Sequence, residues 1–458
     1  MAIEPPVSAS LWERAQLAGI NRRRFIQLLT FGGAAAVLAA CESAIPSPSA
    51  SGTVTSASAA ASGAASASAA PSASAAPTAM FVKSEEPFLK VFDTELGTPW
   101  WQQSSFVTPY EHFYVRNRYA TPVVDASTWE LRVHGDAVSE ELTLTYDELI
   151  ALPSVNAPRV MECFGNGRTV NREQLDYDVQ GGNWVFSDVS QGEWTYVPIQ
   201  VILDRVRPTS QAAQLLFWSG VDGPDTGRPI DMTEINSRSD VIGLAYKLNG
   251  VDLPPDHGGP VRALVPGWGG AASIKWLTEI QISSHGFWTR MHTREEVYIG
   301  DDYPAEEPGP EDEFLGAVAE DIRGQTGKEL FVKSWLAIPY VIRISEPAGN
   351  YPLDVGEVPQ LASGAQMIRG YANAPMSGIA KVEYSVDDGA WQAATLVPPF
   401  DLPYSWVRFE FEWDAPAGTH DLRTRATDND GNVQPETVVF NELGINCNAI
   451  ARFEVEVA

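Results

Sequence analysis

The stretch Val160-Met161-Glu162-Cys163-Phe164-Gly165-Asn166-Gly167-Arg168 places one thiol in a glycine-rich turn directly after a short, mainly apolar run. Glycine lets a backbone approach a bulky group closely, and a cysteine can present its sulfur to a metal. The arginine five residues after the cysteine adds a fixed positive charge that suits an anion. The pattern indicates a metal site that handles an anion, although a lone cysteine among apolar residues is also typical of a buried small hydrophobe.

This segment resembles the Cys-x-Gly-Asn-x-Arg motif of the sulfite oxidase family, in which the cysteine ligates the molybdenum of a molybdopterin cofactor. The resemblance extends over residues 105–458. The stretch 108–117 (TPYEHFYVRN) is similar to the family's Thr-Pro-x-x-x-Phe-x-x-Arg-Asn-His segment, with Arg118 in the place of the histidine. It implies that this stretch wraps the pterin and that Arg116 also reaches the substrate, although Arg116 could instead face solvent. The implied pterin contacts here are Phe113, Tyr114, Arg116 and Asn117.

A second specific match runs from Leu244 through residues 253–262 (LPPDHGGPVR) to Trp276. A pyranopterin ends in a phosphate and carries many ring donors and acceptors, so it requires cationic and hydrogen-bonding groups together with close backbone approach. The groups expected to supply them are His257, Arg262, Ser273 and Lys275, and the Gly267–Gly270 run supplies the backbone approach. An isolated His257 would by default be a satisfied buried histidine. Asp222 matches a family acid that contacts the cofactor, or it is a turn aspartate.

Sulfite and sulfate carry up to two negative charges, and arginine can bind two of their oxygens at once while it stays protonated. The resemblance implies that Arg116, Arg168 and Arg408 surround the substrate, and that Arg408 is contributed by the C-terminal domain. Arg408 could instead pair with Glu410 or Glu412 on a solvent-facing side. The family's pocket tyrosine is assigned to Tyr298. With Cys163 as the molybdenum ligand, these residues form the expected catalytic set.

Two folded domains are expected after the N-terminal region. Residues 84–340 resemble the family's α+β molybdopterin-binding domain; within them we predict strands at 128–134 and 261–265 and a helix at 198–206. In residues 341–458 the apolar side chains alternate at 407–413 and 453–457, and residues 382–386 run into an Asp-Gly turn. This pattern predicts an all-β immunoglobulin-like sandwich. The region also resembles the family's dimerisation domain, which implies a homodimer.

Residues 1–41 read as a twin-arginine export signal that closes with a lipobox, in which Cys41 would be lipidated. An ordinary secretory signal is the alternative. Residues 42–83 consist largely of Ser, Ala, Pro, Gly and Thr up to about residue 80 and cannot bury a core, so they are expected to be a flexible tether. We therefore predict export by the twin-arginine route and a lipid anchor that holds the protein at the outer face of the cytoplasmic membrane.

The formal net charge of −28 argues against nucleic acid as a partner and favours basic proteins. No Cys-x-x-Cys-His sequence occurs, so no covalent c-type haem is expected on this chain, and the six histidines show no zinc-site spacing. The resemblance implies one molybdenum-molybdopterin per chain, oxidation of sulfite or a related sulfur oxyanion, and an external c-type cytochrome as electron acceptor. The alternatives are a sulfane dehydrogenase, a reductase of oxidised methionine, and a lipid-anchored binding protein with a decayed site.

Overall fold

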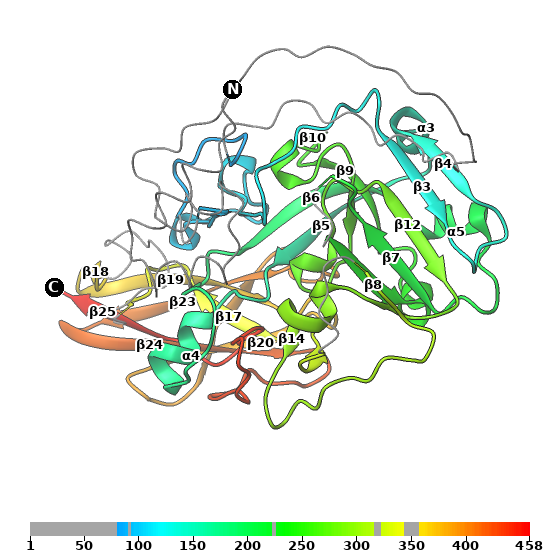
Figure 1. Cartoon of the computed structure of the whole chain (residues 1–458). Coiled ribbons are helices and arrows are strands. Elements are labelled where there is room, and N and C mark those ends of the chain that lie inside the picture. The colour runs from blue at the N-terminus through cyan, green and yellow to red at the C-terminus, as the bar shows by residue number, and fades with distance from the viewer. Residues whose placement is uncertain (1–79, 90–92, 222–225, 316–321, 343–356) are drawn as a thin grey trace, which may run out of the picture. The chain divides into compact units, whose positions relative to one another are not determined.

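The protein is described here from a computed structural model, which covers residues 80–89, 93–221, 226–315, 322–342 and 357–458 (Figure 1). Strands make up most of the secondary structure, and the helices are short. None of the helices in these ranges has the length and apolar character needed to cross a membrane.

Two five-stranded sheets form the first half of the fold. One sheet is antiparallel with the order β10–β9–β6–β5, and β11 also pairs with β9. Its strands are β5 (Val155–Glu162), β6 (Val189–Pro198), β9 (Gly243–Leu248), β10 (Val251–Asp252) and β11 (Arg262–Leu264). The other sheet has the order β4–β3–β12–β7–β8, in which only β12 and β3 run parallel. Its strands are β3 (Glu130–His134), β4 (Leu142–Thr145), β7 (Gln214–Trp218), β8 (Gly227–Asp231) and β12 (Glu279–Ser283).

A hydrophobic core joins these sheets to the short helices α3 (Tyr146–Ile150), α5 (Ile199–Val206) and α6 (Met232–Ser237). The predicted strands at 128–134 and 261–265 are confirmed as β3 and β11. The predicted helix at 198–206 is confirmed as α5, which follows Pro198 and buries Ile199, Ile202, Leu203 and Val206. The apolar spacing of three and four residues therefore identified both the helix and its buried face.

The cysteine loop lies between a strand and a helix. Strand β5 ends at Glu162, the loop follows, and α4 (Arg168–Leu175) begins at Arg168. Gly167, the residue before the helix, has φ +88°, a left-handed conformation that glycine adopts without strain. The chain therefore turns sharply just after Cys163.

Two further sheets form the C-terminal sandwich, with the orders β17–β19–β23–β22 and β18–β25–β24–β20–β21. Their strands are β17 (Lys333–Leu336), β18 (Gln360–Leu361), β19 (Gly364–Asn373), β20 (Ile379–Val386), β21 (Gln392–Ala393), β22 (Thr395–Val397), β23 (Val407–Ala415), β24 (Gly418–Asp428) and β25 (Arg452–Val457). Apolar residues alternate with more exposed ones along β23 and β25, as their sequences predict. The immunoglobulin-like sandwich is confirmed.

Smaller elements complete the chain, several of them around the site described below. They are the strand pairs β1 (Glu95–Leu96) with β2 (Val115–Arg116), β13 (Phe287–Trp288) with β15 (Glu313–Phe314), and β14 (Val297–Tyr298) with β16 (Gln325–Thr326), and the single turns η1 (Trp100–Gln102), η2 (Tyr110–His112), η3 (Pro255–His257), η4 (Gly270–Ala272) and η5 (Met291–Glu295).

The sandwich packs closely against the preceding part of the chain. Phe186 stacks on Trp335 and Phe453 with ring centroids 6.2 and 5.6 Å apart, and one hydrophobic core contains all three. Strand β17 pairs with β19 although it lies before residue 341. The domain boundary at 340/341 stays a prediction, and packing is continuous across it.

Candidate active site

A cavity of about 550 Å³ lies beside the cysteine loop. Segments from widely separated parts of the chain line it. They are residues 113–118, the cysteine loop, 180–184, 257–276, 291–296 and the C-terminal pair Leu443 and Ile445. The cavity brings together most of the residues that the sequence assigned to cofactor and substrate.

Cys163 lines this cavity, and its backbone N–H donates to the carbonyl of Asp188 at 2.9 Å. Burial raises the pKa of its thiol, and the nearby carboxyl groups of Asp188 and Glu296 raise it further. A thiol with a raised pKa is mostly protonated and therefore a weak nucleophile, and a metal cation would favour its thiolate form; the residue itself is half-buried. The structure thus agrees with a ligand role for Cys163 and gives no support to a free reactive cysteine.

Two predicted substrate arginines flank one tryptophan. The guanidinium carbons of Arg116 and Arg168 lie 5.7 and 5.2 Å from the ring centre of Trp184, and all three residues line the cavity. Arg168 also donates from Nε to the carbonyl of Leu443 at 2.7 Å. Cation–π contact and this hydrogen bond hold the buried Arg168 in the cavity wall, whereas Arg116 is exposed and is positioned by its contact with the ring. Burial lowers the pKa of Arg168 from its ordinary value.

Carboxyl groups balance part of this charge. Arg118, which replaces the family's histidine, forms an ion pair with Glu295. The neighbouring Glu296 lines the cavity, and burial raises its pKa to about 7 although the nearby Arg228 lowers it. Its Oε2 atom is buried without a hydrogen-bond partner in the described part of the chain. A carboxyl group with a raised pKa therefore belongs to the same cavity wall as the arginines.

The predicted pterin residues form another part of the wall. His257 stacks edge-on against Phe113 with ring centroids 5.1 Å apart, and its Nε2 lies 3.2 Å from Lys83 Nζ. Burial lowers the pKa of His257 well below its usual range, and the positive charges of Lys83, Lys275 and Arg262 lower it further. The imidazole is therefore neutral. Burial also lowers the pKa of Lys83 to about 7.

Arg262 and Lys275 donate hydrogen bonds to backbone carbonyls, and Lys275 also donates to the side-chain amide oxygen of Asn117. Arg262 donates to the carbonyls of His257 and Ser273 at 3.0 and 2.6 Å. Lys275 Nζ donates to Asn117 Oδ1 at 2.6 Å and to the carbonyl of Asp256 at 2.7 Å. Ser273 accepts the Val265 N–H, and Tyr114 lies in the same wall. Arg262 and Lys275 thus bring positive charge to the cavity, and their hydrogen bonds fix its shape.

Two predicted residues do not reach this cavity. Arg408 donates to the carbonyl of Pro398 at 2.7 Å and lies over the Phe106 ring, so it contacts neither Glu410 nor a cavity residue in the described chain. Tyr298 accepts a hydrogen bond from Asn446 Nδ2 at 2.8 Å and lines a different cavity of about 490 Å³. Their catalytic roles stay predictions. Asp222 and Cys41 lie outside the described residues.

Sequence reasoning missed Lys83, Trp184, Glu296, Leu443 and Ile445. Lys83 had been assigned to the tether, yet its ammonium group contacts His257 and the carbonyls of Tyr110 and Phe113. Trp184 ends the segment Gly181-Gly182-Asn183-Trp184, and a large aromatic residue two positions after a glycine pair is the signal that could have identified it. The C-terminal pair carries no comparable local signal.

The cavity suits a large anionic cofactor. Six cationic side chains line it against two carboxyl groups, one of them with its pKa near 7. The cationic residues are Arg116, Arg118, Arg168, Arg262, Lys275 and Arg294. At Gly270 an added Cβ would lie 2.9 Å from the Tyr114 hydroxyl, so backbone there comes as close as only glycine allows. One thiol that can bind a metal, several cationic side chains and closely approaching backbone together fit a metal-carrying phosphorylated pterin.

No cluster of three or more His, Cys, Asp or Glu side chains that could hold a metal occurs within the described ranges.

Comparison with known proteins agrees with this geometry. Residues 118–289 match the oxidoreductase molybdopterin binding domain, and residues 338–458 match the Mo-co oxidoreductase dimerisation domain. The mitochondrial sulfite oxidases of Rattus norvegicus and Homo sapiens are each 28% identical over 398 residues, which cover 83% of this chain and 66% of those proteins. The sulfane dehydrogenase SoxCD from Paracoccus pantotrophus has a similar fold, with a TM-score of 0.65 and 22% identity over 79% of this chain and 84% of that one.

The two matched domains are those of a molybdopterin oxidoreductase. The chain belongs to the sulfite oxidase-like family, with a molybdopterin-binding domain followed by a Mo-co dimerisation domain. It spans just under two thirds of the length of the mitochondrial relatives named above.

Proposed function

We propose that this protein oxidises sulfite to sulfate and passes the electrons to an external c-type cytochrome. The observation that carries the proposal is the position of Arg116 and Arg168 on Trp184 in the same cavity as Cys163. An anion of the size of sulfite requires fixed positive charges near the reacting group, and these two arginines supply them.

The residues of the cavity would have separate roles in catalysis and in cofactor binding. Bound through Cys163, the molybdenum cofactor would supply the two-electron oxidation of the substrate. Arg116 and Arg168 would bind and orient the anion, and Trp184 keeps both guanidinium groups in place. Arg262, Ser273, Lys275 and the neutral His257 would hold the pterin side of the cofactor. Glu296, which lines the same cavity and has its pKa raised to about 7, would accept a proton during turnover.

The decisive experiment compares substrates on the purified full-length protein. Sulfite, thiosulfate and a reduced sulfane compound are supplied as electron donors with ferricyanide or cytochrome c as acceptor, and methionine sulfoxide is offered as an oxidant with a reduced dye. We expect turnover with sulfite and none with the other compounds. Oxidation of the sulfane compound without oxidation of sulfite would contradict the proposal.

The matched control is Cys163→Ser, which removes the thiolate and changes little else. We expect this variant to keep its pterin, because other residues grip that group, and to lose turnover. Turnover near the wild-type level would show that Cys163 is not the metal ligand.

We further propose a homodimer, formed through the C-terminal domain, and a place at the outer face of the cytoplasmic membrane. Support comes from the match to a dimerisation domain and from the arginine pair and lipobox in residues 1–41. The net charge of −28 favours a basic cytochrome as partner. Cys41→Ser should move the protein from the membrane fraction to the released fraction. Continued tight membrane binding of this variant would contradict the lipid anchor.

A further inference from the structure

We propose that Lys333 is a positioning residue whose ion pair with Glu162 fixes the loop that presents Cys163 to the metal. The lysine belongs to β17, so a strand of the C-terminal sandwich takes part in placing the metal ligand. This inference rests on the assignment of Cys163 as the molybdenum ligand.

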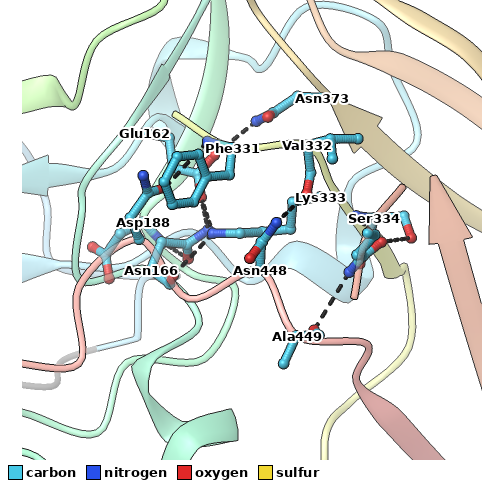
Figure 2. A network of polar contacts seen from close by, with 12 residues as sticks. Glu162, Asn166, Asp188, Phe331, Val332, Lys333, Ser334, Asn373, Asn448 and Ala449 are labelled. Atoms are coloured by element: carbon cyan, nitrogen blue, oxygen red, sulfur yellow. Dashed lines mark hydrogen bonds and ion pairs between the residues drawn. The ribbon is translucent and has the colours of Figure 1, made fainter. Parts of the chain in front are cut away.

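Glu162 is the last residue of β5 and directly precedes Cys163. Its carboxylate is fully buried and accepts three hydrogen bonds from side chains. Oε1 accepts from Lys333 Nζ at 2.6 Å and from Asn166 Nδ2 at 2.9 Å, and Oε2 accepts from Asn373 Nδ2 at 2.7 Å. Figure 2 shows these groups converging on the carboxylate.

Lys333 is as deeply buried as its partner. The side chains of the ion pair are 2% and 1% exposed. The ammonium group also donates to the backbone carbonyl of Asn166 at 3.1 Å. A buried charge is tolerated only when it is paired and hydrogen-bonded, so removal of either partner leaves the other charge uncompensated.

The ion pair holds the loop on both sides of the cysteine. Glu162 stands one residue before Cys163 and Asn166 three residues after it, and Lys333 binds both. Asn166 Oδ1 accepts the backbone N–H of Asp188 at 3.2 Å, and Cys163 N–H donates to the Asp188 carbonyl at 2.9 Å. The loop itself contains two glycines and has little stiffness of its own. Its conformation therefore depends on groups outside it.

The C-terminal part of the chain reinforces this contact. Asn446 N–H donates to the carbonyl of Phe164 at 2.6 Å, and an added Cβ at Gly167 would lie 3.1 Å from the carbonyl of Cys447. Partners outside the ligand shell commonly change activity by about 10–100-fold when they are removed. The same order of effect is expected from Lys333.

The test uses Lys333→Met, with Ser334→Ala as the matched control. Ser334 is the next residue of β17, is equally buried, and bonds to Gln434 and Thr424 within the sandwich. Molybdenum content, the electron paramagnetic resonance spectrum of Mo(V) after chemical reduction, and sulfite kinetics are measured on the purified holoproteins. For Lys333→Met we expect a shifted Mo(V) spectrum and a kcat lower by about tenfold, with a sulfite KM that stays within about threefold of wild type. Ser334→Ala should match the wild type in all three.

The Mo(V) spectrum needs no substrate, so it separates this inference from the proposed function. If the wild type holds molybdenum but does not oxidise sulfite, the proposed function fails and the spectra still test the role of Lys333. A wild-type spectrum in Lys333→Met, even with a lowered melting temperature, would reduce the ion pair to a stabilising contact and overturn the inference. Should Lys333→Met not fold, Glu162→Gln decides, because it removes the negative charge of the ion pair and keeps a side chain of the same size: a shifted spectrum supports the inference, and an unchanged one overturns it.

Discussion

Gly165→Ala is expected to destabilise the protein and to weaken sulfite binding through one contact. An added Cβ would overlap the Trp184 ring atoms Cε3 and Cζ3, and it would lie 3.1 Å from Cδ2 of the same ring. The ring is only 5% exposed and lines the cavity, so a displaced ring would enter the space that the cofactor and the substrate need. Its faces carry the guanidinium groups of Arg116 and Arg168. Displacement of the ring must therefore move the two positive charges of the site.

The magnitude follows from packing. Overpacking a close-packed interior costs about 1–3 kcal/mol, and overlap with a rigid ring places Gly165→Ala at the upper end, near 3 kcal/mol. Gly165 does not have a positive φ, so the backbone adds no strain of its own. Loss of one charge-assisted hydrogen bond to the substrate costs about 1.5–3 kcal/mol, which corresponds to a KM for sulfite raised by about tenfold or more.

Urea unfolding and steady-state kinetics measure the two effects. Gly220→Ala is the control, because its added Cβ would meet only Thr278 Oγ1, at 3.1 Å. The same substitution at Gly165 is then made in a Trp184→Ala background, where the clash is absent. We expect most of the stability cost to vanish there, since contacting residues are not additive. An equal cost in both backgrounds would refute the argument, because the ring would then not be the group that the Cβ meets.

Two further predictions concern charged groups. In the cofactor-free protein the pKa of Glu296 is raised from 4.5 to about 7. The folded state therefore binds a proton at this carboxyl group more tightly than the unfolded state does. The free energy of unfolding should fall by about 3 kcal/mol as the pH rises from about 4.5 to 7. Glu296→Gln should flatten this part of the curve of unfolding free energy against pH, and an unchanged slope would exclude Glu296 as its source. Arg408→Met should leave the sulfite KM within about twofold of wild type, because Arg408 binds the Pro398 carbonyl and does not line the cavity; a strong rise in KM would restore the substrate role predicted from the sequence.

Sequence alone determined the elements whose signal is local. The alternation along residues 407–413 and 453–457 gave the faces of β23 and β25, and the three-to-four spacing after Pro198 gave α5. These periodicities arise within one element, so a few consecutive residues suffice to reveal them. The motif around Cys163 also indicated the class of site through its resemblance to the cysteine motif of the sulfite oxidase family, whereas its residue types alone left a buried small hydrophobe as an alternative.

Tertiary structure alone decided which distant groups complete the site. The sequence suggested that the C-terminal domain reaches the cavity through Arg408, whereas the structure places Leu443 and Ile445 in its wall. It also sets Lys333 against Glu162, 171 residues earlier in the chain. Such contacts depend on how whole sheets pack, and a lysine in a short strand looks no different in sequence whether its ammonium group meets water or a buried carboxylate. No local sequence pattern reports burial. Because Lys333 is buried, its ammonium group pairs with the carboxylate beside the cysteine loop and not with water.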